Sequence, residues 1–280
     1  MYDIPVIDFT SPQAPMLFVQ SLKKTGFGVL KNHPLDQGQI ESIYRHWQTF
    51  FSSGKKHQFH FNSDTQDGFF PVSVSEVAKD HAIRDIKEFF HVYPWGQIPP
   101  DLRNEALCYY NEASQLAARV LRWVEVHAPL SVKSGFSIPL SDMIKDSTRT
   151  LLRVLHYPPL KGTEEPGAIR AAAHEDINLL TVLPAASEPG LQVQLSSGEW
   201  VDVPCEFGTL IINTGDMLQE ASGHYFPSTT HRVINPIGEK SEQSRISLPL
   251  FLHSRDEVKL SEKYTAGSYL YERLQQLGLK

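Results

Sequence analysis

The spacing of apolar residues changes near residue 148, and this change restricts the fold more than any other feature of the sequence. Before it, apolar residues recur at helical spacing over Gln39–Phe51 and from Pro99-Pro100 to about His127. After it, short runs of alternating residues indicate many strands separated by turns, which favours a β-sandwich or barrel. The expected strands are Arg149–Tyr157, Asn178–Leu183, Leu191–Leu195, Glu199–Val203, Thr209–Asn213, His231–Asn235 and Arg245–His253.

The first 148 residues are expected to be mostly helical. Asp36 precedes the first amphipathic segment as a candidate N-cap, and Asp101 follows the proline pair as the expected cap of the second. Gly26–Leu30 is predicted to be a short strand between helices. The loop Asn62–Gly68 is polar and ends in glycine, so we expect that it could act as a lid over a site.

Helical spacing returns after Ser261, which makes the C-terminal helix a second candidate lid. We therefore predict a single, mainly β domain in which a helical N-terminal layer packs on a β-barrel closed by a C-terminal helix. A chain of 280 residues is long enough to bury one such core. The helix would carry Leu270, Leu274 and Leu277 on one side, and the three regions are 1–148, 149–255 and 256–280.

Charge and cysteine content argue against several classes of protein. The net charge is −6 and no run of five Lys or Arg residues occurs, so nucleic acid and anionic membranes are not expected partners. No window of about 20 apolar residues predicts a membrane span, and Met1–Pro5 lacks the pattern of a signal peptide. Cys108 and Cys205 form no CxxC and are interpreted as reduced thiols, so we expect a cytoplasmic protein.

The motif His174-Glu175-Asp176 is the first candidate for chemistry. On a strand, residues i and i+2 point to the same face, so His174 and Asp176 could reach one metal ion while Glu175 points away. Such a motif also occurs by chance, and a third ligand is needed. His231, at the start of a later predicted strand, can supply it. Two histidines and one carboxylate occupy one face of an octahedral ion and leave the other face open for O₂ and a co-substrate.

Arg245 and Ser247 follow the same i, i+2 spacing and therefore share a strand face. A guanidinium and a hydroxyl form a good receptor for a carboxylate, because the planar fork can bond both oxygens. In isolation, a surface arginine and a strand serine are the more ordinary interpretation. Together with the two histidines and the aspartate, the pair predicts a bound carboxylate near the metal.

The order of these motifs resembles that of the 2-oxoglutarate/Fe(II) dioxygenases of the isopenicillin N synthase-like family. The resemblance covers nearly the whole chain, and its later segments precede His231 as the family pattern requires. The matching segments are Ile4–Phe9, Gly26–His33, Asp85–Phe90, Gly190–Val193, Gly198–Val201, Asn213–Asp216 and Ser222-Gly223.

This resemblance implies a distorted double-stranded β-helix, or jelly roll, that holds Fe(II) and uses 2-oxoglutarate and O₂. Asp176 and the two histidines would be the metal ligands and the catalytic centre. Arg245 and Ser247 would bind the distal carboxylate of 2-oxoglutarate, and Tyr157 would add a hydrogen bond to the same molecule. The implied reaction oxidises a small organic molecule by hydroxylation, desaturation or ring closure, with release of succinate and CO₂.

Two positions refine the expectation. Related halogenases have a small residue where this chain has Asp176, so chlorination is disfavoured. The family often has asparagine two residues before the tyrosine, whereas this chain has Leu155 before Tyr157, which removes an amide contact and makes the pocket more apolar. The substrate space is expected to involve Phe89, His91, Leu155, Phe251 and His253, although ordinary core or surface roles fit each of them equally well.

Three other functions fit the same residues. An oxidase of this fold that does not use 2-oxoglutarate would use Arg245 and Ser247 to bind a substrate carboxylate. A non-catalytic barrel could bind Zn²⁺ or an organic ligand as a sensor, since such a site accepts several divalent ions. A protein or nucleic-acid hydroxylase is the third, although the acidic charge argues against nucleic acid. The sequence identifies neither the primary substrate nor the oligomeric state.

Overall fold

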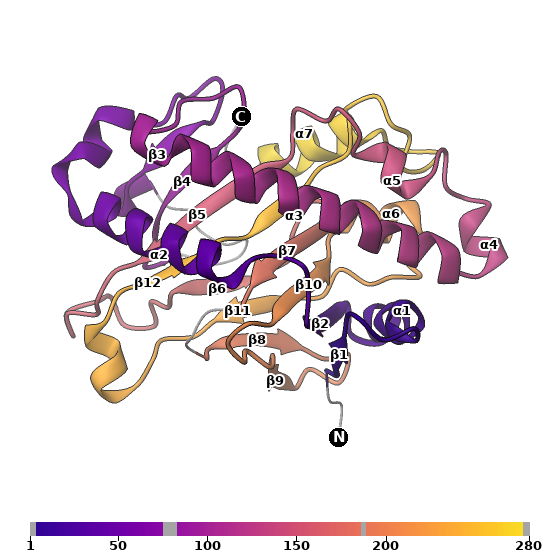
Figure 1. Cartoon of the computed structure of the whole chain (residues 1–280), viewed down its shortest axis with the longest axis horizontal. Helices are drawn as coiled ribbons and strands as arrows, with labels where there is room; N and C mark the ends of the chain where they lie inside the picture. The colour runs from indigo at the N-terminus through magenta and orange to yellow at the C-terminus, as the bar shows by residue number, and fades with distance from the viewer. Residues whose placement is uncertain (1–3, 75–82, 186–188, 277–280) are drawn as a thin grey trace.

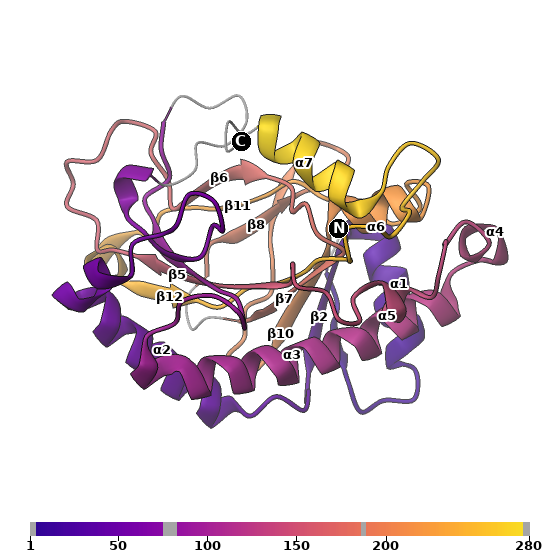
Figure 2. The same cartoon turned by 90° about the horizontal axis from the view of Figure 1, so that it is seen from above.

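The computed structural model describes residues 4–74, 83–185 and 189–276. Within these ranges a larger sheet faces a smaller one, and α2 and α3 cover the outer face of the larger sheet (Figures 1 and 2). In sheet order the larger sheet contains β1 (Val6–Asp8), β2 (Phe27–Lys31), β10 (Leu210–Thr214), β7 (Leu180–Pro184), β13 (Leu250–Leu252), β5 (Leu151–Tyr157), β4 (Glu88–Val92) and β3 (Gly68–Phe70), with β12 (Arg245–Ser247) also paired to β5. The smaller sheet contains β6 (Ala171–His174), β11 (His231–Val233), β8 (Leu191–Gln194) and β9 (Trp200–Asp202). The predicted fold, mainly β with flanking helices, is confirmed.

The two long helices start in different ways. Asp36 caps the first of them as predicted, because its side chain accepts a hydrogen bond from the backbone N–H of Gln39 at 2.7 Å. The predicted cap Asp101 is wrong: the second helix begins at Pro100, and Asp101 lies in its first turn. The N-cap residue is Pro99, which has no side-chain oxygen, so no side-chain cap forms. The helices are α1 (Ala14–Thr25), α2 (Gln37–Ser52), α3 (Pro100–His127), α4 (Leu130–Lys133), α5 (Leu140–Met143), α6 (Asp216–Ala221) and α7 (Ala266–Gln276), with 3-10 turns η1 (Gly54–Phe59), η2 (Val72–Val74) and η3 (Gly238–Glu242).

The N-terminal half contributes more strand than the sequence predicts. The predicted strand at Gly26–Leu30 is present as β2, but β1, β3 and β4 join the same sheet. All five residues of β4 are buried, so this strand lacks the alternation of polar and apolar residues by which strands are recognised. Because β4 pairs with β5 along its whole length, residues before and after position 148 form one continuous sheet.

Most of the later strands are shorter than predicted. The strand expected over Arg245–His253 is divided into β12 and β13, because Pro249 lies between them and has no N–H for a continuous ladder. The predicted C-terminal helix is present as α7, in which Leu270 and Leu274 are partly buried; Leu277 lies outside the described residues. No helix in the described ranges combines the length and the apolarity needed to cross a membrane.

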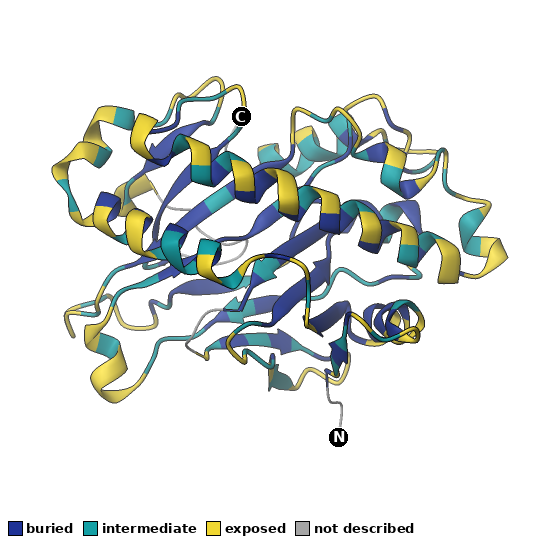
Figure 3. Ribbon diagram, in the orientation of Figure 1, coloured by how far each residue is buried: buried dark blue, intermediate teal, exposed yellow. Residues whose placement is uncertain are grey.

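The main core lies between the helices and the outer face of the larger sheet. The side of α3 that faces the sheet is buried and its opposite side is exposed (Figure 3). Trp47 of α2 is fully buried in the same layer, where burial of such a ring stabilises the fold by about 2–3 kcal/mol. This packing fixes the larger sheet as a rigid wall, and the inner face of that wall is available for a site.

Candidate metal centre and its cavity

His174, Asp176 and His231 lie together at one end of the smaller sheet. β6 and β11 are antiparallel neighbours in which His231 is directly opposite His174. The expectation that the whole motif lies on a strand is wrong, because β6 ends at His174 and Asp176 follows in the connection to β7. Even so, Oδ1 of Asp176 lies 3.9 Å from Nε2 of His174 and 3.8 Å from Nε2 of His231. All three potential ligand atoms lie within 4.8 Å of one another.

Backbone carbonyls orient both imidazole rings. Nδ1 of His174 lies 2.7 Å from the carbonyl oxygen of Ala172, and Nδ1 of His231 lies 3.1 Å from that of Thr229. A carbonyl only accepts hydrogen bonds, so each Nδ1 carries the hydrogen and each Nε2 presents a lone pair. Each ring is thereby fixed in the tautomer that a metal ligand requires.

Two donors orient the carboxylate in the same way. The hydroxyl of Thr181 and the side-chain amide of Asn213 donate to Oδ2 of Asp176 at 2.5 Å and 2.8 Å. Oδ1 is therefore the oxygen that faces the two histidines. Burial by itself would raise the pKa of Asp176, but the nearby His231 and His174 and these hydrogen bonds outweigh it, so its pKa lies below the usual range.

The protonation states also suit a metal. Desolvation in the cavity, followed by repulsion from His231, lowers the pKa of His174 to about 4, so this ring is neutral at pH 7. Two imidazoles and one carboxylate, with an open side toward a cavity, form the donor set that proteins use for Fe(II) in non-haem oxygenases. The residues present therefore fit Fe(II).

Arg245, Ser247 and Tyr157 lie together on neighbouring strands of the larger sheet. β12 pairs with β5 so that Arg245 is opposite Tyr157 and Ser247 is opposite Leu155. Nη1 of Arg245 donates to the carbonyl of Pro189 at 3.2 Å, while its Nε is buried and has no hydrogen-bond partner among the described residues. A buried donor without a partner is costly, so this nitrogen fits a bound acceptor.

The surroundings of Tyr157 favour an anion. Burial raises the pKa of Tyr157, and the positive charges of Lys87, Arg245 and Arg170 act against that shift. Asp85, which forms an ion pair with Lys87 at 2.8 Å, acts in the direction of the shift. The positive charge of Arg245 beside this phenol fits an anionic co-substrate such as 2-oxoglutarate.

A cavity of about 520 Å³ lies next to the metal ligands His174 and Asp176, which form part of its wall. Four of the five expected substrate residues also line it: Phe89, His91, Phe251 and His253. Leu155 is not among the lining residues but is buried in a small apolar cluster with Phe70, Phe89 and Tyr157, and two of these rings, Phe70 and Phe89, line the cavity, so its role in substrate binding stays a prediction. Arg245 and Ser247 do not line this cavity either.

Two family models match the chain. One, described as the 2OG-Fe(II) oxygenase superfamily, matches residues 149–254, and the other, described as the non-haem dioxygenase in morphine synthesis N-terminal region, matches residues 4–114. A solved structure from Shewanella oneidensis, named provisionally as an oxygenase, is 57% identical, covers 100% of both chains and has a TM-score of 0.91. The chain belongs to the 2OG-Fe(II) oxygenase superfamily.

Other members of this superfamily are more distant. A structure from Caulobacter crescentus, named provisionally as a 2OG-Fe(II) oxygenase family protein, is 27% identical, covers 99% of this chain and 100% of its own, and has a TM-score of 0.83. Gibberellin 2-beta-dioxygenase 1 of Arabidopsis thaliana is 25% identical over 95% of this chain and 87% of its own length. The chain is therefore an oxidoreductase of a family that uses Fe(II), 2-oxoglutarate and O₂, and the predicted jelly-roll fold is confirmed.

The cavity of this oxygenase contains an arginine, Arg153, that was not among the expected site residues. Arg153 lies on β5 between Leu151 and Leu155 and contributes to the cavity wall. The signal was present in the predicted strand Arg149–Tyr157, because alternation places Arg153 on the same face as Tyr157. An arginine on an inward face needs a partner or a ligand, and this requirement marks the position as a candidate site residue.

Both candidate lid segments border the cavity. Asp64, Thr65 and Gln66 of the polar loop line it, and so do Leu270 and Leu274 of α7. α7 is attached to α6 by an ion pair of 2.9 Å between Arg273 and Asp216. Movement of either segment on substrate binding stays a prediction, which ligand-dependent proteolysis of the two segments would test.

Proposed function

We propose that this protein is a dioxygenase that couples the conversion of 2-oxoglutarate to succinate and CO₂ with the hydroxylation, desaturation or ring closure of a small organic molecule. His174, Asp176 and His231 would hold Fe(II), and Arg245, Ser247 and Tyr157 would hold 2-oxoglutarate. The observation that supports this assignment most strongly is the convergence of two Nε2 atoms and one carboxylate oxygen beside a cavity. The proposal includes a cytoplasmic setting, for which the free thiols Cys108 and Cys205 are the support.

When bound, Fe(II) and 2-oxoglutarate supply the oxidising chemistry with O₂. The residues of the chain bind and orient these two groups. His174 is already neutral at pH 7, so no proton has to leave it when a metal binds. The guanidinium of Arg245 would neutralise the distal carboxylate and satisfy its own buried Nε. The buried aromatic wall, which includes Phe70 and Phe89, would keep bulk water from the reacting substrate.

A small molecule is the favoured substrate. The volume of about 520 Å³ is in the range of cavities that enclose metabolite-sized ligands. The net charge of −6 disfavours a nucleic-acid polymer. The absence of an amide at Leu155 keeps one alternative open, in which Arg245 and Ser247 bind a substrate carboxylate and 2-oxoglutarate is not used.

The first test is an anaerobic titration of the iron-loaded protein with 2-oxoglutarate, followed by the weak visible charge-transfer absorption of the Fe(II) complex. We expect the band in wild type and a dissociation constant about 10- to 100-fold higher in Arg245→Leu, since a charged hydrogen bond contributes about 1.5–3 kcal/mol. Arg232→Leu is the matched control, because Arg232 is also a strand arginine but lies over Trp200 and donates to Gln192, away from the cavity.

The titration distinguishes the 2-oxoglutarate-dependent dioxygenase from an oxidase that does not use 2-oxoglutarate. A band that is weakened by Arg245→Leu and not by Arg232→Leu supports the assignment of the 2-oxoglutarate receptor. A folded, iron-loaded wild type that gives no band would overturn it and support the oxidase that uses Arg245 for a substrate carboxylate. Production of succinate from 2-oxoglutarate in the presence of O₂ provides an independent readout.

A further inference from the structure

His253 lines the cavity but is not one of the three potential metal ligands. It directly follows β13, in which the side chains of Leu250 and Leu252 enter the main core. Because alternate residues of a strand point to opposite faces, Phe251 and His253 point the other way, and both line the cavity. An imidazole outside the metal centre is thus placed on the inner wall.

The register of the larger sheet brings this imidazole beside the carboxylate ligand. β13 pairs with β7 so that Phe251 is opposite Thr181, and the hydroxyl of Thr181 donates to Oδ2 of Asp176 at 2.5 Å. The charge of Asp176 is one of those that act on the His253 ring. A ligand group bound at His253 would therefore lie next to the metal centre.

The polar atoms of His253 are not used by the part of the chain that the structure describes. Its Nδ1 is buried without a hydrogen-bond partner there, and its Nε2 makes no hydrogen bond to another described residue. In His174 and His231, by contrast, Nδ1 lies against a backbone carbonyl. A buried polar group without a partner costs about 1–3 kcal/mol, so this imidazole fits a ligand that completes its hydrogen bonding.

The ring is suited to an uncharged ligand group. Desolvation lowers the pKa of His253 to about 4, so at pH 7 the ring is neutral and offers one N–H donor and one lone pair. Charges of both signs act on it, since Asp176 and Asp256 raise its pKa while Arg149 and Arg153 lower it. A hydroxyl or carbonyl oxygen can bond such a ring without bringing a charge of its own into the cavity.

Apolar side chains form much of the surrounding cavity wall. In the pairing of β13 with β5, Phe251 is opposite Leu151, and both residues line the cavity. Further apolar residues of the lining are Ile177, Leu270 and Leu274. A pocket of this kind holds a mostly apolar molecule and uses a few polar groups to fix its orientation.

This position is also separate from the expected 2-oxoglutarate receptor. On β5, Tyr157 is opposite Arg245, whereas Leu151, at the other end of the strand, is opposite Phe251. Six residues of strand separate the two points, which corresponds to about 20 Å of backbone. A ligand group at His253 would therefore not compete with a carboxylate at Arg245.

We propose that the primary substrate is a mostly apolar molecule with an uncharged hydroxyl or carbonyl group, and that His253 determines this specificity by hydrogen-bonding that oxygen. The apolar body would contact Phe251 and Leu151, and the bond to His253 would hold the neighbouring carbon close to the metal centre. This inference rests on the proposed function, because it names the substrate class of the same site. His253 is a binding residue in this assignment and takes no part in binding iron or 2-oxoglutarate.

The test compares oxygenated probes with hydrocarbons of the same shape. Benzyl alcohol is paired with ethylbenzene, 2-phenylethanol with propylbenzene, and acetophenone with isopropylbenzene. Each probe is titrated anaerobically into the protein loaded with Fe(II) and saturated with 2-oxoglutarate, and binding is measured by calorimetry. For at least one pair, His253→Leu should weaken the oxygenated probe about 5-fold relative to its hydrocarbon, because a neutral hydrogen bond contributes about 1 kcal/mol. His253→Gln should keep part of this preference, since its amide can also donate and accept.

Two comparisons separate the hydrogen bond from general packing. The hydrocarbon of each pair should still bind to His253→Leu, which shows that the cavity of this variant is intact. Phe251→Leu is the matched control on the same face, and it should weaken both members of a pair alike because it removes only apolar contact.

The inference is overturned if no pair shows a preference that depends on His253. It is also overturned if phenylacetate, the charged relative of 2-phenylethanol, loses more affinity in His253→Leu than the alcohol does. A charge-transfer band with 2-oxoglutarate but no such preference would reject this inference alone. Absence of the band together with a preference that depends on His253 would reject the proposed function and leave the hydrogen-bonding position in place.

Discussion

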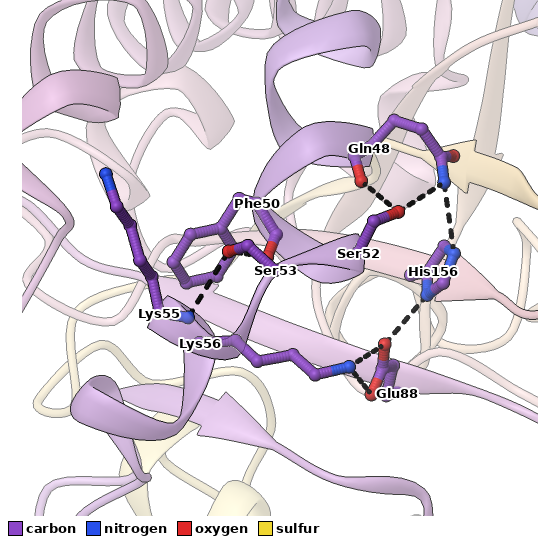
Figure 4. A network of polar contacts seen from close by, with 8 residues as sticks. All are labelled: Gln48, Phe50, Ser52, Ser53, Lys55, Lys56, Glu88 and His156. Atoms are coloured by element: carbon purple, nitrogen blue, oxygen red, sulfur yellow. Dashed lines mark hydrogen bonds and ion pairs between the residues drawn. The ribbon is translucent and has the colours of Figure 1, made fainter.

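The two faces of β5 carry polar residues of opposite character. On the outer face, Nδ1 of His156 donates to Glu88 at 2.8 Å, and Glu88 also accepts from Lys56 at 2.9 Å (Figure 4). Gln48 lies 3.4 Å from the other nitrogen of the His156 ring, and Phe51 stacks on that ring. Here protein groups pair with one another and attach α2 and η1 to the sheet.

On the inner face some polar groups are held in position by the protein and keep one atom without a partner among the described residues. Nε of Arg245 and Nδ1 of His253 are buried without a hydrogen-bond partner among the described residues. In the metal centre, Oδ2 of Asp176 and Nδ1 of each histidine are hydrogen-bonded to the protein. The three potential ligand atoms, Oδ1 of Asp176 and the two Nε2 atoms, face one another. The difference teaches that burial of a polar group does not identify its role, whereas the way its bonds are completed does. Outer-face changes should affect stability, and inner-face changes should affect binding.

The largest effect is expected for His174→Ala. Its Nε2 is one of three ligand atoms, and even partners of ligands usually change metal affinity 10- to 100-fold, so iron affinity should fall by more than about 1000-fold. The iron-free variant should unfold at the wild-type denaturant concentration, because His174 is partly exposed and its imidazole hydrogen bond is to a local carbonyl. Anaerobic iron titration and denaturant unfolding measure the two quantities. His127→Ala, at the exposed end of α3, is the control, and wild-type iron affinity in His174→Ala would contradict the assignment.

Glu88→Ala should give the opposite result, a loss of stability without a loss of iron affinity. It leaves Lys56 and His156 without their carboxylate in a poorly hydrated layer, and breaking such a buried pair costs about 3–5 kcal/mol of the free energy of unfolding. Iron affinity should stay at the wild-type value, because Glu88 does not line the cavity. Glu257→Ala, which removes an exposed carboxylate paired with Arg255, should leave the stability close to the wild-type value. Equal losses in the two variants would show that the outer network has no special structural role.

The sequence predicted the inner face better than the outer one, for a physical reason. His174 and Asp176 are two residues apart, as are Arg245 and Ser247, so local backbone geometry alone brings each pair together. The aspartate in fact lies beyond the strand, but the short separation still keeps its carboxylate near the imidazole. Because the two residues are so close in the sequence, their side chains lie near each other even though the strand ends before Asp176.

The outer network joins residues 56, 88 and 156, and no local pattern connects them. Their proximity depends on the register of β4 with β5, in which Glu88 is opposite His156, and β4 was not predicted. Arg153 was missed for a different reason, because its position was predictable from alternation but its partners Phe89 and His91 come from that same unpredicted strand. Pairing between distant strands is therefore the information that the sequence pattern lacked.

A smaller effect is expected for Asn213→Leu, which tests whether the hydrogen-bond partners of the metal ligands change the iron affinity. The amide of Asn213 donates to Oδ2 of Asp176 at 2.8 Å, and its loss should weaken iron binding by about 10- to 100-fold. Asn235→Leu is the matched control, because it also removes a partly buried amide, but one that donates to the carbonyl of Ala168. Iron titration measures the affinity of both variants. An equal fall in the two affinities would contradict the expectation.

The smallest effect is expected from the titration of Glu88, and it isolates the charge of the outer network from its packing. Burial alone would raise the pKa of Glu88, but the hydrogen bonds from His156 and Lys56 outweigh it, so its folded pKa lies below the usual 4.5. A carboxylate with a lowered pKa stabilises the fold above pH 4.5, and this contribution is lost as the pH falls through the folded pKa.

The difference in unfolding free energy between wild type and Glu88→Gln should therefore be largest near pH 7 and should shrink as the pH is lowered below 4.5. Asp176, whose pKa is also lowered, is present in both proteins and cancels from the difference. Urea unfolding of both proteins at several pH values measures this difference. If the difference in unfolding free energy does not change with pH, then shape and hydrogen bonding, and not charge, are what the outer face of β5 contributes to stability.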